Sequence, residues 1–225
     1  KTFQLQQMMA STSDSLMIYC PLYRESCRTF LHRLACTVLQ AGLGAAGGQS
    51  LEALLHQAGE RLPRLAAALH PVEALVARRG FSEAFNRSLD AIPVLSSERR
   101  RPCVFIVDEF LFLEELGLSH AFHELGKRVM IWPTTLFVLS SSSPTRAKTI
   151  LRERLQLLFG QFELLSLEAL DVHRTSTWVH HELGELGGVR NVSPFLVSWL
   201  GSSPWHLTVF LKRLKELAAV RQTLE

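Results

Sequence analysis

The 225-residue sequence has no uninterrupted apolar run near the roughly 20 residues that a membrane-spanning helix needs. Its longest candidate, Val129–Leu139, is short and contains Pro133. An excess of one charge is also missing, because 24 Lys and Arg face 21 Asp and Glu, and a net charge of +3 does not by itself indicate nucleic-acid binding. With 47% hydrophobic and 20% charged residues, the composition is globular rather than disordered or fibrous. We therefore expect a soluble, cytoplasmic protein without a membrane partner.

Cysteine is scarce as well, and the sequence has no CxxC pair among Cys20, Cys27, Cys36 and Cys103. Buried, reduced thiols are the expected state. The histidine pairs His120/His123 and His180/His181 lack a nearby cysteine cluster or a third ligand at metal-site spacing, so we expect no zinc site.

The first residue is Lys1 rather than Met, and no signal peptide follows. The last residue, Glu225, falls inside a charged helical pattern with no capping Gly or Pro after it. We expect the chain to be a fragment that is cut at both ends.

Short apolar runs alternate with helical patterns through most of the chain. The predicted strands are Leu16–Cys20, Val104–Val107, Thr135–Leu139 and Phe162–Leu165. The predicted helices between and before them are Thr2–Ala10, Ser26–Gln40, Leu51–Arg79, Phe81–Ile92, Leu116–Arg128 and Pro144–Leu158. Alternating strands and helices predict an α/β fold with a parallel sheet flanked by helices.

The strand patterns stop near Leu170. Helical patterns then cover Val172–Glu185, Val192–Leu200 and Pro204–Leu224. We therefore expect an α/β domain over residues 1–170 and a small helical domain over residues 171–225. The glycine-rich stretch Gly42–Ser50 follows a helix, so it is interpreted as a helix–helix connection and not as a phosphate-binding loop.

The predicted strand Val104–Val107 runs directly into Asp108 and Glu109. Ligands bind outside the carboxyl ends of strands in open α/β sheets, so these carboxylates are candidate site residues. Asp108 is suited to hold Mg²⁺ on a nucleotide, and Glu109 to polarise the water that attacks the γ-phosphate. The alternative is a plain acidic helix N-terminus, where the helix dipole favours negative charge.

The next predicted strand ends in the hydroxyl cluster Ser140–Ser143. A polar side chain at this edge is placed to contact a γ-phosphate or the attacking water. A serine-rich turn that caps the following helix is the alternative for each serine.

Lys1 and Thr2 match the last two positions of the phosphate-binding motif GxxxxGK[ST], and a helical pattern follows them. The glycines of such a motif would precede Lys1. The match gains weight from the order of the acidic and serine-ended strands that follow.

These segments together resemble the ATPase core of a P-loop NTPase of the AAA+/STAND kind. The similar stretches are KTFQLQQ, VFIVDEF, TLFVLSSSS, RAKTILRERLQLLFGQFELLSLEALD and LGSSPWHL. They span residues 1 to about 214 and correspond to the Walker A end, Walker B, sensor 1, the last helix and strand of the core, and a lid motif. The resemblance implies a fold of the ASCE type whose first strand is missing from this chain, with a C-terminal helical lid.

The resemblance also implies residue roles. Lys1 and Thr2 would bind phosphates, and Thr2 and Asp108 would serve Mg²⁺. Glu109 would be the catalytic base, and Ser140 or Ser141 would be sensor 1.

Arg154 or Arg152 would be an arginine finger acting on a neighbouring subunit's nucleotide, with a solvated helix face paired with Glu153 as the alternative. Pro204 would approach the adenine. Ser202 and Ser203 depart from the Gly and His of the family's lid motif, which leaves the base contact open.

The missing first strand would lie between the serine-ended strand and Phe162–Leu165 in this family. We therefore expect a gap or a collapsed contact at that place, no complete phosphate cradle, and poor ATP binding by the fragment alone.

The implied function is an ATP-binding, ATP-hydrolysing regulatory module with ATP and Mg²⁺ as ligands, and it is compatible with a homo-oligomer. Two alternatives stay open. One is a degenerate, non-catalytic module that binds protein or DNA partners, and the other is an origin-recognition-type AAA+ ATPase with a DNA-binding domain beyond Glu225. The basic run Arg99–Arg101 is the best hint of nucleic acid, although a solvated loop is its simpler interpretation.

Overall fold

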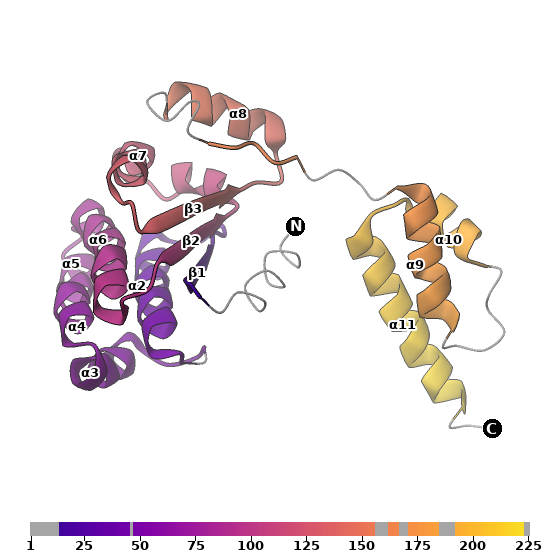
Figure 1. Ribbon diagram of the computed structural model, residues 1–225, viewed down its shortest axis with the longest axis horizontal. Coiled ribbons are helices and arrows are strands. Elements are labelled where there is room, and N and C mark those ends of the chain that lie inside the picture. Colours follow the sequence, from indigo (N-terminus) through magenta and orange to yellow (C-terminus); the bar gives the residue numbers. More distant parts are fainter. Residues whose placement is uncertain (1–13, 46, 156–161, 167–170, 185–191, 223–225) are drawn as a thin grey trace. The chain divides into compact units, whose positions relative to one another are not determined.

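A computed structural model describes residues 14–45, 47–155, 162–166, 171–184 and 192–222. The chain divides into two compact units, Lys1–Glu163 and Leu164–Glu225 (Figure 1). Among the described residues, none of the helices has the length and apolar character needed to cross a membrane.

The first unit contains a parallel sheet in the order β1-β2-β3. Its strands are β1 (Leu16–Pro21), β2 (Cys103–Asp108) and β3 (Thr135–Ser140), which confirms three of the four predicted strands within a residue or two. In the register, Asp108 of β2 lies between Pro21 of β1 and Ser140 of β3. The carboxyl ends of all three strands therefore meet at one edge of the sheet.

Helices flank this sheet, as the sequence predicted. They are α2 (Cys27–Leu43), α3 (Leu51–Arg61), α4 (Pro63–Leu69), α5 (Pro71–Ala77), α6 (Phe81–Arg99), α7 (Ala121–Ile131) and α8 (Pro144–Glu153), with a 3-10 helix η1 (Phe110–Glu114) after β2. Figure 1 shows α2 to α6 gathered beside the sheet. Leu16, Ile18 and Cys20 of β1 belong to the buried core that these helices share with the sheet.

Proline divides the long helix predicted over Leu51–Arg79. Pro63 and Pro71 each begin a new helix, α4 and α5, because proline has no N–H to donate within a helix but fits the first helical turn. The N-terminus of α4 is capped from a distance, since the Glu98 carboxylate accepts hydrogen bonds from the backbone N–H groups of Arg64 and Leu65, both at 3.0 Å.

Other element boundaries also differ from the prediction. The helix predicted to end at Ile92 continues through Pro93 to Arg99, because Leu95 and Ser96 in its last turns are buried against the core. The helix predicted from Leu116 begins only at Ala121, because the residues directly after β2 form the 3-10 helix η1 instead.

The predicted helix Pro144–Leu158 ends at Glu153. The fourth predicted strand, Phe162–Leu165, is wrong, since residues 162–166 form neither strand nor helix. Leu164 and Leu165 are 59% and 79% exposed, so this apolar stretch is not buried in the sheet as the prediction required. Within the described part of the chain, β3 therefore ends the sheet on the side where the first strand and Phe162–Leu165 were expected.

Two glycines near the end of α2 have structural roles. A Cβ on Gly42 would lie 2.9 Å from side-chain atoms of Leu62 and Leu95, so glycine lets α2 approach those residues closely. Gly44 ends the helix in a left-handed conformation, with φ 66°. This stretch therefore ends α2 and connects it to α3, as predicted.

The second unit consists, in its described residues, of α9 (Val172–Gly184), α10 (Ser193–Leu200) and α11 (Pro204–Gln222), close to the predicted spans. Its small apolar core contains Val179, Leu183, Leu196, Val197, Leu207 and Leu211. Such a cluster has the helical spacing that a three-helix unit needs to bury one face of each helix.

Several expectations fall outside the described residues. They are the helix Thr2–Ala10 with Lys1 and Thr2, and the last residues of the helix Pro204–Leu224. The boundary expected between residues 170 and 171 adjoins residues 167–170, which are also outside the described ranges, and it stays a prediction.

Candidate functional site

Asp108 is a buried carboxylate at the carboxyl end of the central strand. Its side chain is 3% exposed and accepts hydrogen bonds from both neighbouring strands. Tyr19 Oη of β1 donates to Oδ2 at 2.8 Å, and Ser140 Oγ of β3 donates to Oδ1 at 2.5 Å. The backbone N–H of Glu109 donates to Oδ1 at 3.1 Å. Strand pairing and side-chain donors together fix the position of this carboxylate.

The parallel register explains this convergence. Alternate residues of a strand point to the same side of the sheet, and laterally paired residues share a side. Ser140 is the direct lateral partner of Asp108, and Tyr19 stands two residues before the other partner, Pro21. The long tyrosine ring spans the remaining distance along the strand.

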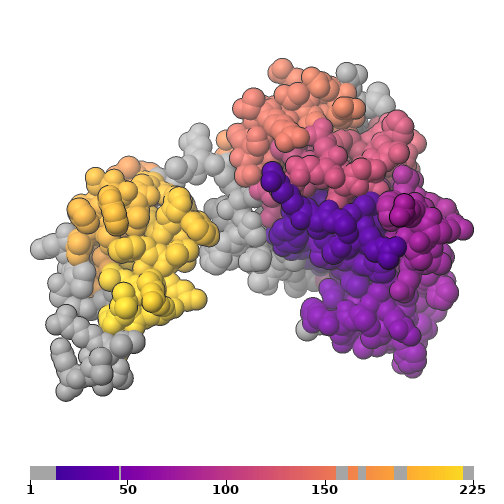
Figure 2. All heavy atoms as spheres, turned by 180° about the vertical axis from the view of Figure 1, so that it is seen from behind, coloured from indigo at the N-terminus to yellow at the C-terminus, as the bar shows by residue number. Residues whose placement is uncertain are grey.

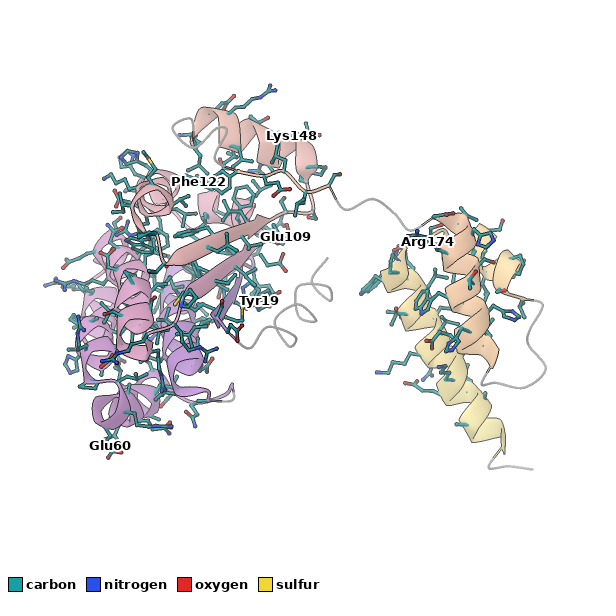
Figure 3. All side chains as sticks on the ribbon, viewed as in Figure 1. Tyr19, Glu60, Glu109, Phe122, Lys148 and Arg174 are labelled. Carbon is teal, nitrogen blue, oxygen red and sulfur yellow. The ribbon has the colours of Figure 1, made fainter. Side chains whose placement is uncertain are left out.

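Glu109 follows in a left-handed backbone conformation, with φ 56° and ψ 45°. This region is unfavourable for a residue with a Cβ, and non-glycine residues that occupy it gather at functional sites. The carboxylate is partly exposed, and Oε2 accepts hydrogen bonds from the backbone N–H and the hydroxyl of Ser142, both at 3.1 Å. The conformation therefore turns Glu109 toward the serine loop that follows β3. Figure 3 labels Glu109 at the carboxyl ends of the strands.

The four serines divide between two roles. Ser140 and Ser142 contact the acidic pair, whereas Ser141 interacts within its own loop, where its hydroxyl accepts from the Ser143 backbone N–H at 3.0 Å. Ser140 is thus brought to the acidic pair as predicted. Ser141 bonds within the loop and does not cap α8, whose N-terminus has no side-chain cap. Ser142, which the sequence did not single out, is the serine that holds Glu109.

Ion pairs join Glu114 and Glu115, which follow Glu109, to arginines from two other segments near the carboxyl edge of the sheet. Glu114 pairs with Arg146 of α8 at 2.5 Å, and Glu115 pairs with Arg24 of the β1–α2 turn at 3.6 Å. Each pair is largely solvent-exposed and contributes little stability, with exposed pairs worth about 0.2–1 kcal/mol. They do place positive side chains near the carboxyl edge of the sheet.

Cys20 lies beside Tyr19 in sequence but on the opposite side of β1. Burial raises the pKa of the Cys20 thiol to about 12, and burial also raises the pKa of Cys103 to about 11. Cys20 and Cys103 are free and buried, as predicted, whereas Cys27 and Cys36 are free but only partly buried. A thiol with so high a pKa is neutral at physiological pH and is no nucleophile for the site.

Of the remaining predicted site residues, the structure describes only Arg152 and Arg154 within the first unit. Lys1 and Thr2 lie outside the described residues. Arg152 is in the last turn of α8 and Arg154 directly follows it; both are exposed, and the ten-residue helix carries them about 15 Å from the serine loop. Pro204 is the exposed first residue of α11 in the second unit.

The basic run Arg99–Arg101 at the end of α6 is largely engaged in hydrogen bonds within the chain. Arg99 donates from two side-chain nitrogens to the backbone carbonyl of Gly42, and Arg101 donates to the carbonyl of Ser15 at 3.1 Å. Arg100 ends α6 in a left-handed conformation. These contacts explain the arginines by helix termination and packing and give no support to a nucleic-acid surface.

The acidic edge offers the hard oxygen donors that Mg²⁺ prefers. Asp108, Glu109 and the hydroxyls of Ser140 and Ser142 lie together there, and Mg²⁺ on a nucleotide typically takes one or two carboxylates with water and phosphate oxygens. No group of three or more His, Cys, Asp or Glu suited to a metal occurs among the described residues.

Two side chains of the site, Tyr19 and Ser142, were missed from the sequence. Tyr19 has a recognisable signal in the sequence. It stands in a predicted parallel strand two residues before Pro21, and residues two apart in a strand point to the same side of the sheet, so its side chain can reach a group at the carboxyl end. Ser142 has none, because only the turn after β3 decides which of four consecutive serines faces Glu109.

Comparison of the chain with protein-family models, with curated proteins and with solved structures gave no significant match.

Proposed function

We propose that this chain is a nucleotide-binding module of the P-loop NTPase type, related to AAA+/STAND ATPases, which holds Mg²⁺-ATP at the carboxyl edge of β1-β2-β3 and hydrolyses it. The proposal rests chiefly on one observation: Asp108 ends the central strand of a parallel sheet, is buried, and is held by Tyr19 and by Ser140 of the adjacent strand. A solvated acidic helix N-terminus would not need these cross-strand donors.

The two carboxylates have environments that suit different tasks. Asp108 is buried and fixed, as a group that holds Mg²⁺ directly or through water must be. Glu109 is partly exposed and bonded to a loop, so it is placed to reach a water molecule. In this assignment, Glu109 accepts a proton from water as the water oxygen bonds to the γ-phosphorus. The bond from that phosphorus to the bridging oxygen breaks, and ADP leaves with that oxygen.

The serines support the same assignment. Ser140 orients Asp108, and Ser142 sets the direction of the Glu109 carboxylate. In this proposal Lys1 and Thr2 bind the phosphates, Thr2 also serving the metal, while Pro204 contacts the base and Arg154 acts on a neighbouring subunit's nucleotide. These four roles come from the resemblance.

The test is steady-state ATP hydrolysis by the full-length protein. Glu109→Gln keeps the size of the side chain and an oxygen that can accept from Ser142, but it removes the base. We expect the rate to fall at least about 100-fold, within the range that general-base catalysis contributes. Glu115→Gln is the matched control, since it changes an exposed carboxylate paired with Arg24 and should leave the rate within twofold.

Equal rates for wild type and Glu109→Gln would remove Glu109 from the reaction. A loss of the same size in Glu115→Gln would show that any change of charge near this edge is damaging, and the catalytic assignment would then fail.

A further inference from the structure

Both carboxylates of the acidic pair have one oxygen atom that is fully engaged in hydrogen bonds. At Asp108, Oδ1 accepts from Ser140 Oγ and from the backbone N–H of Glu109. At Glu109, Oε2 accepts from the backbone N–H and from the hydroxyl of Ser142. An ionised carboxylate has two lone pairs on each oxygen. Donors of the chain itself therefore take both lone pairs of Asp108 Oδ1 and of Glu109 Oε2, and we call these two atoms the closed oxygens.

The segment after β3 closes both atoms. Ser140 is the last residue of β3, and Ser142 stands two residues later on the exposed loop that leads to α8. In Figure 2, the salmon-coloured α8 that follows this loop lies at the surface of the first unit. Two serines from one short segment therefore act on the two carboxylates in the same way.

The other oxygen of Asp108 is restricted as well. Oδ2 accepts from Tyr19 Oη at 2.8 Å, so at most one of its lone pairs is left for a metal or for a metal-bound water. Asp108 is also 3% exposed, which leaves little of the carboxylate open to a cation. While the serines stay bonded, each carboxylate of the pair can offer a cation at most one oxygen.

The number of oxygens that a carboxylate offers discriminates between divalent cations. Ca²⁺ takes about six to eight oxygens at about 2.3–2.6 Å and often binds both oxygens of one carboxylate. Mg²⁺ binds at about 2.0–2.1 Å in near-octahedral geometry, keeps several waters, and uses one or two carboxylates together with phosphate oxygens. The nearby Glu114 and Glu115 are each paired with an arginine, so they supply further oxygens only by losing an ion pair. This arrangement therefore disfavours Ca²⁺ and suits Mg²⁺.

We propose that Ser140 and Ser142 are specificity-determining residues, which limit Asp108 and Glu109 to one oxygen each and so select Mg²⁺ over Ca²⁺. The inference rests on the proposed function, because it concerns the cation that accompanies the nucleotide. It assigns the closed oxygens, rather than the charge of the acidic pair alone, as the cause of the selection.

A purely structural role of the serines makes a different prediction. Loss of Ser140 would then loosen Asp108 and weaken Mg²⁺-dependent and Ca²⁺-dependent binding by the same factor. Tyr19 provides the matched comparison, because its hydroxyl donates to the same carboxylate but to the other oxygen. Tyr19→Phe therefore removes one hydrogen bond from Asp108 and leaves Oδ1 closed, whereas Ser140→Ala opens Oδ1.

The experiment measures the dissociation constant of ATP from the full-length protein by isothermal titration calorimetry, in excess Mg²⁺, in excess Ca²⁺ and in EDTA. We expect the wild type to bind ATP at least about tenfold more tightly with Mg²⁺ than with Ca²⁺. Ser140→Ala and, separately, Ser142→Ala should each reduce this ratio at least about threefold, because an opened oxygen lets a carboxylate bind Ca²⁺ through both of its oxygens.

Control variants should keep the wild-type ratio. Tyr19→Phe leaves both closed oxygens unchanged, and Ser141→Ala changes a serine that bonds within its own loop. Ser140→Thr keeps the hydroxyl that donates to Asp108 and should also keep the ratio. Circular dichroism checks that each variant folds, and Ser142→Ala changes an exposed loop residue, so it tests the proposal even if Ser140→Ala unfolds the chain.

The outcomes separate this inference from the function on which it rests. Absence of metal-dependent ATP binding by the wild type would overturn the proposed function and the inference with it. Mg²⁺-dependent binding whose ratio to Ca²⁺-dependent binding is unchanged in both serine variants would overturn the inference alone. The same holds if Tyr19→Phe lowers the ratio as much as Ser140→Ala, or if the wild type binds ATP equally well with the two cations.

Discussion

Tyr19 joins β1 to the buried carboxylate of β2, so its hydroxyl can be removed while its ring stays in place. Tyr19→Phe removes the 2.8 Å hydrogen bond to Asp108. Because Asp108 is 3% exposed, water replaces the lost donor poorly. We expect the free energy of unfolding, measured by urea denaturation, to fall by about 1.5–3 kcal/mol, the range for a hydrogen bond to a charged group.

Tyr23→Phe is the matched control, since it removes the same atom from a side chain that is 55% exposed. Its unfolding free energy should change by less than about 0.5 kcal/mol. Equal effects of the two substitutions would mean that the Tyr19 hydroxyl does not hold Asp108.

The left-handed backbone at Glu109 predicts that glycine is more stable than alanine at this position. Glu109→Ala and Glu109→Gly both lose the hydrogen bonds to Ser142, so their difference reports the backbone alone. At φ 56° glycine avoids the Cβ clash, and the Gly variant should be more stable than the Ala variant by about 1 kcal/mol in thermal or urea unfolding. An Ala variant as stable as the Gly variant would show that the backbone relaxes out of this conformation.

The buried Cys20 thiol predicts a loss of stability at alkaline pH. Burial raises its pKa from 9.0 to about 12, so the folded state keeps its proton at pH values where the unfolded chain releases it. The stabilisation is therefore complete below pH 9 and falls as pH rises from 9 toward 12, by up to about 1.4 kcal/mol per pH unit from this group. Urea denaturation at pH 8, 9 and 10 measures the slope. Cys20→Ala should make the slope shallower without abolishing it, because burial also raises the pKa of Cys103. An unchanged slope would assign the alkaline loss to other groups.

At the scale of elements, the helical layer between β1 and β2 depends on a contact from α6 to α4. Glu98 accepts hydrogen bonds from the first N–H groups of α4 and replaces a local N-cap that Leu62 cannot provide. Glu98→Ala should lower the unfolding free energy by about 1–2 kcal/mol, the range for a lost helix cap. Glu60→Ala, on the surface of α3, is the control and should change it by less than about 0.5 kcal/mol. Similar losses in both variants would contradict the capping role.

The elements that the sequence predicted well have strong local signals. The three observed strands are short apolar runs bounded by Pro or polar residues, and Ser26 and Ser50 cap α2 and α3 with their hydroxyls as expected for helix N-termini. The predicted strand Phe162–Leu165 shows the limit of this signal. An apolar run forms a strand only where a neighbouring strand pairs with it, and this run has no such neighbour in the described structure.

The candidate site was predictable where its residues directly follow a strand with a clear local signal. Asp108, Glu109 and Ser140 follow predicted parallel strands directly, so topology alone places them at one edge. The left-handed turn at Glu109 and its contact with Ser142 depend on the conformation of two loops, which no local pattern specifies. Pro93 shows that a local pattern can also mislead. Proline usually ends a helix, but α6 continues through Pro93 because the following Leu95 is buried.

At the scale of the molecule, the two units present different chemistry. The first has a buried carboxylate that accepts hydrogen bonds from both neighbouring strands at the edge of a parallel sheet, and the second packs three helices around a small apolar core of its own. In our account the acidic edge of the first unit binds and hydrolyses nucleotide.

Equilibrium binding of ATP to the full-length protein, with Mg²⁺ and with EDTA, tests this account most directly. We predict Mg²⁺-dependent binding with a Kd below about 1 mM, the upper end of ordinary enzyme affinities for substrates. Asp108→Asn should weaken that binding at least tenfold in Mg²⁺ and far less in EDTA. Absence of binding near 1 mM ATP, or equal Mg²⁺-dependent affinity in a folded Asp108→Asn protein, would contradict the claim that this acidic edge holds a metal-bound nucleotide.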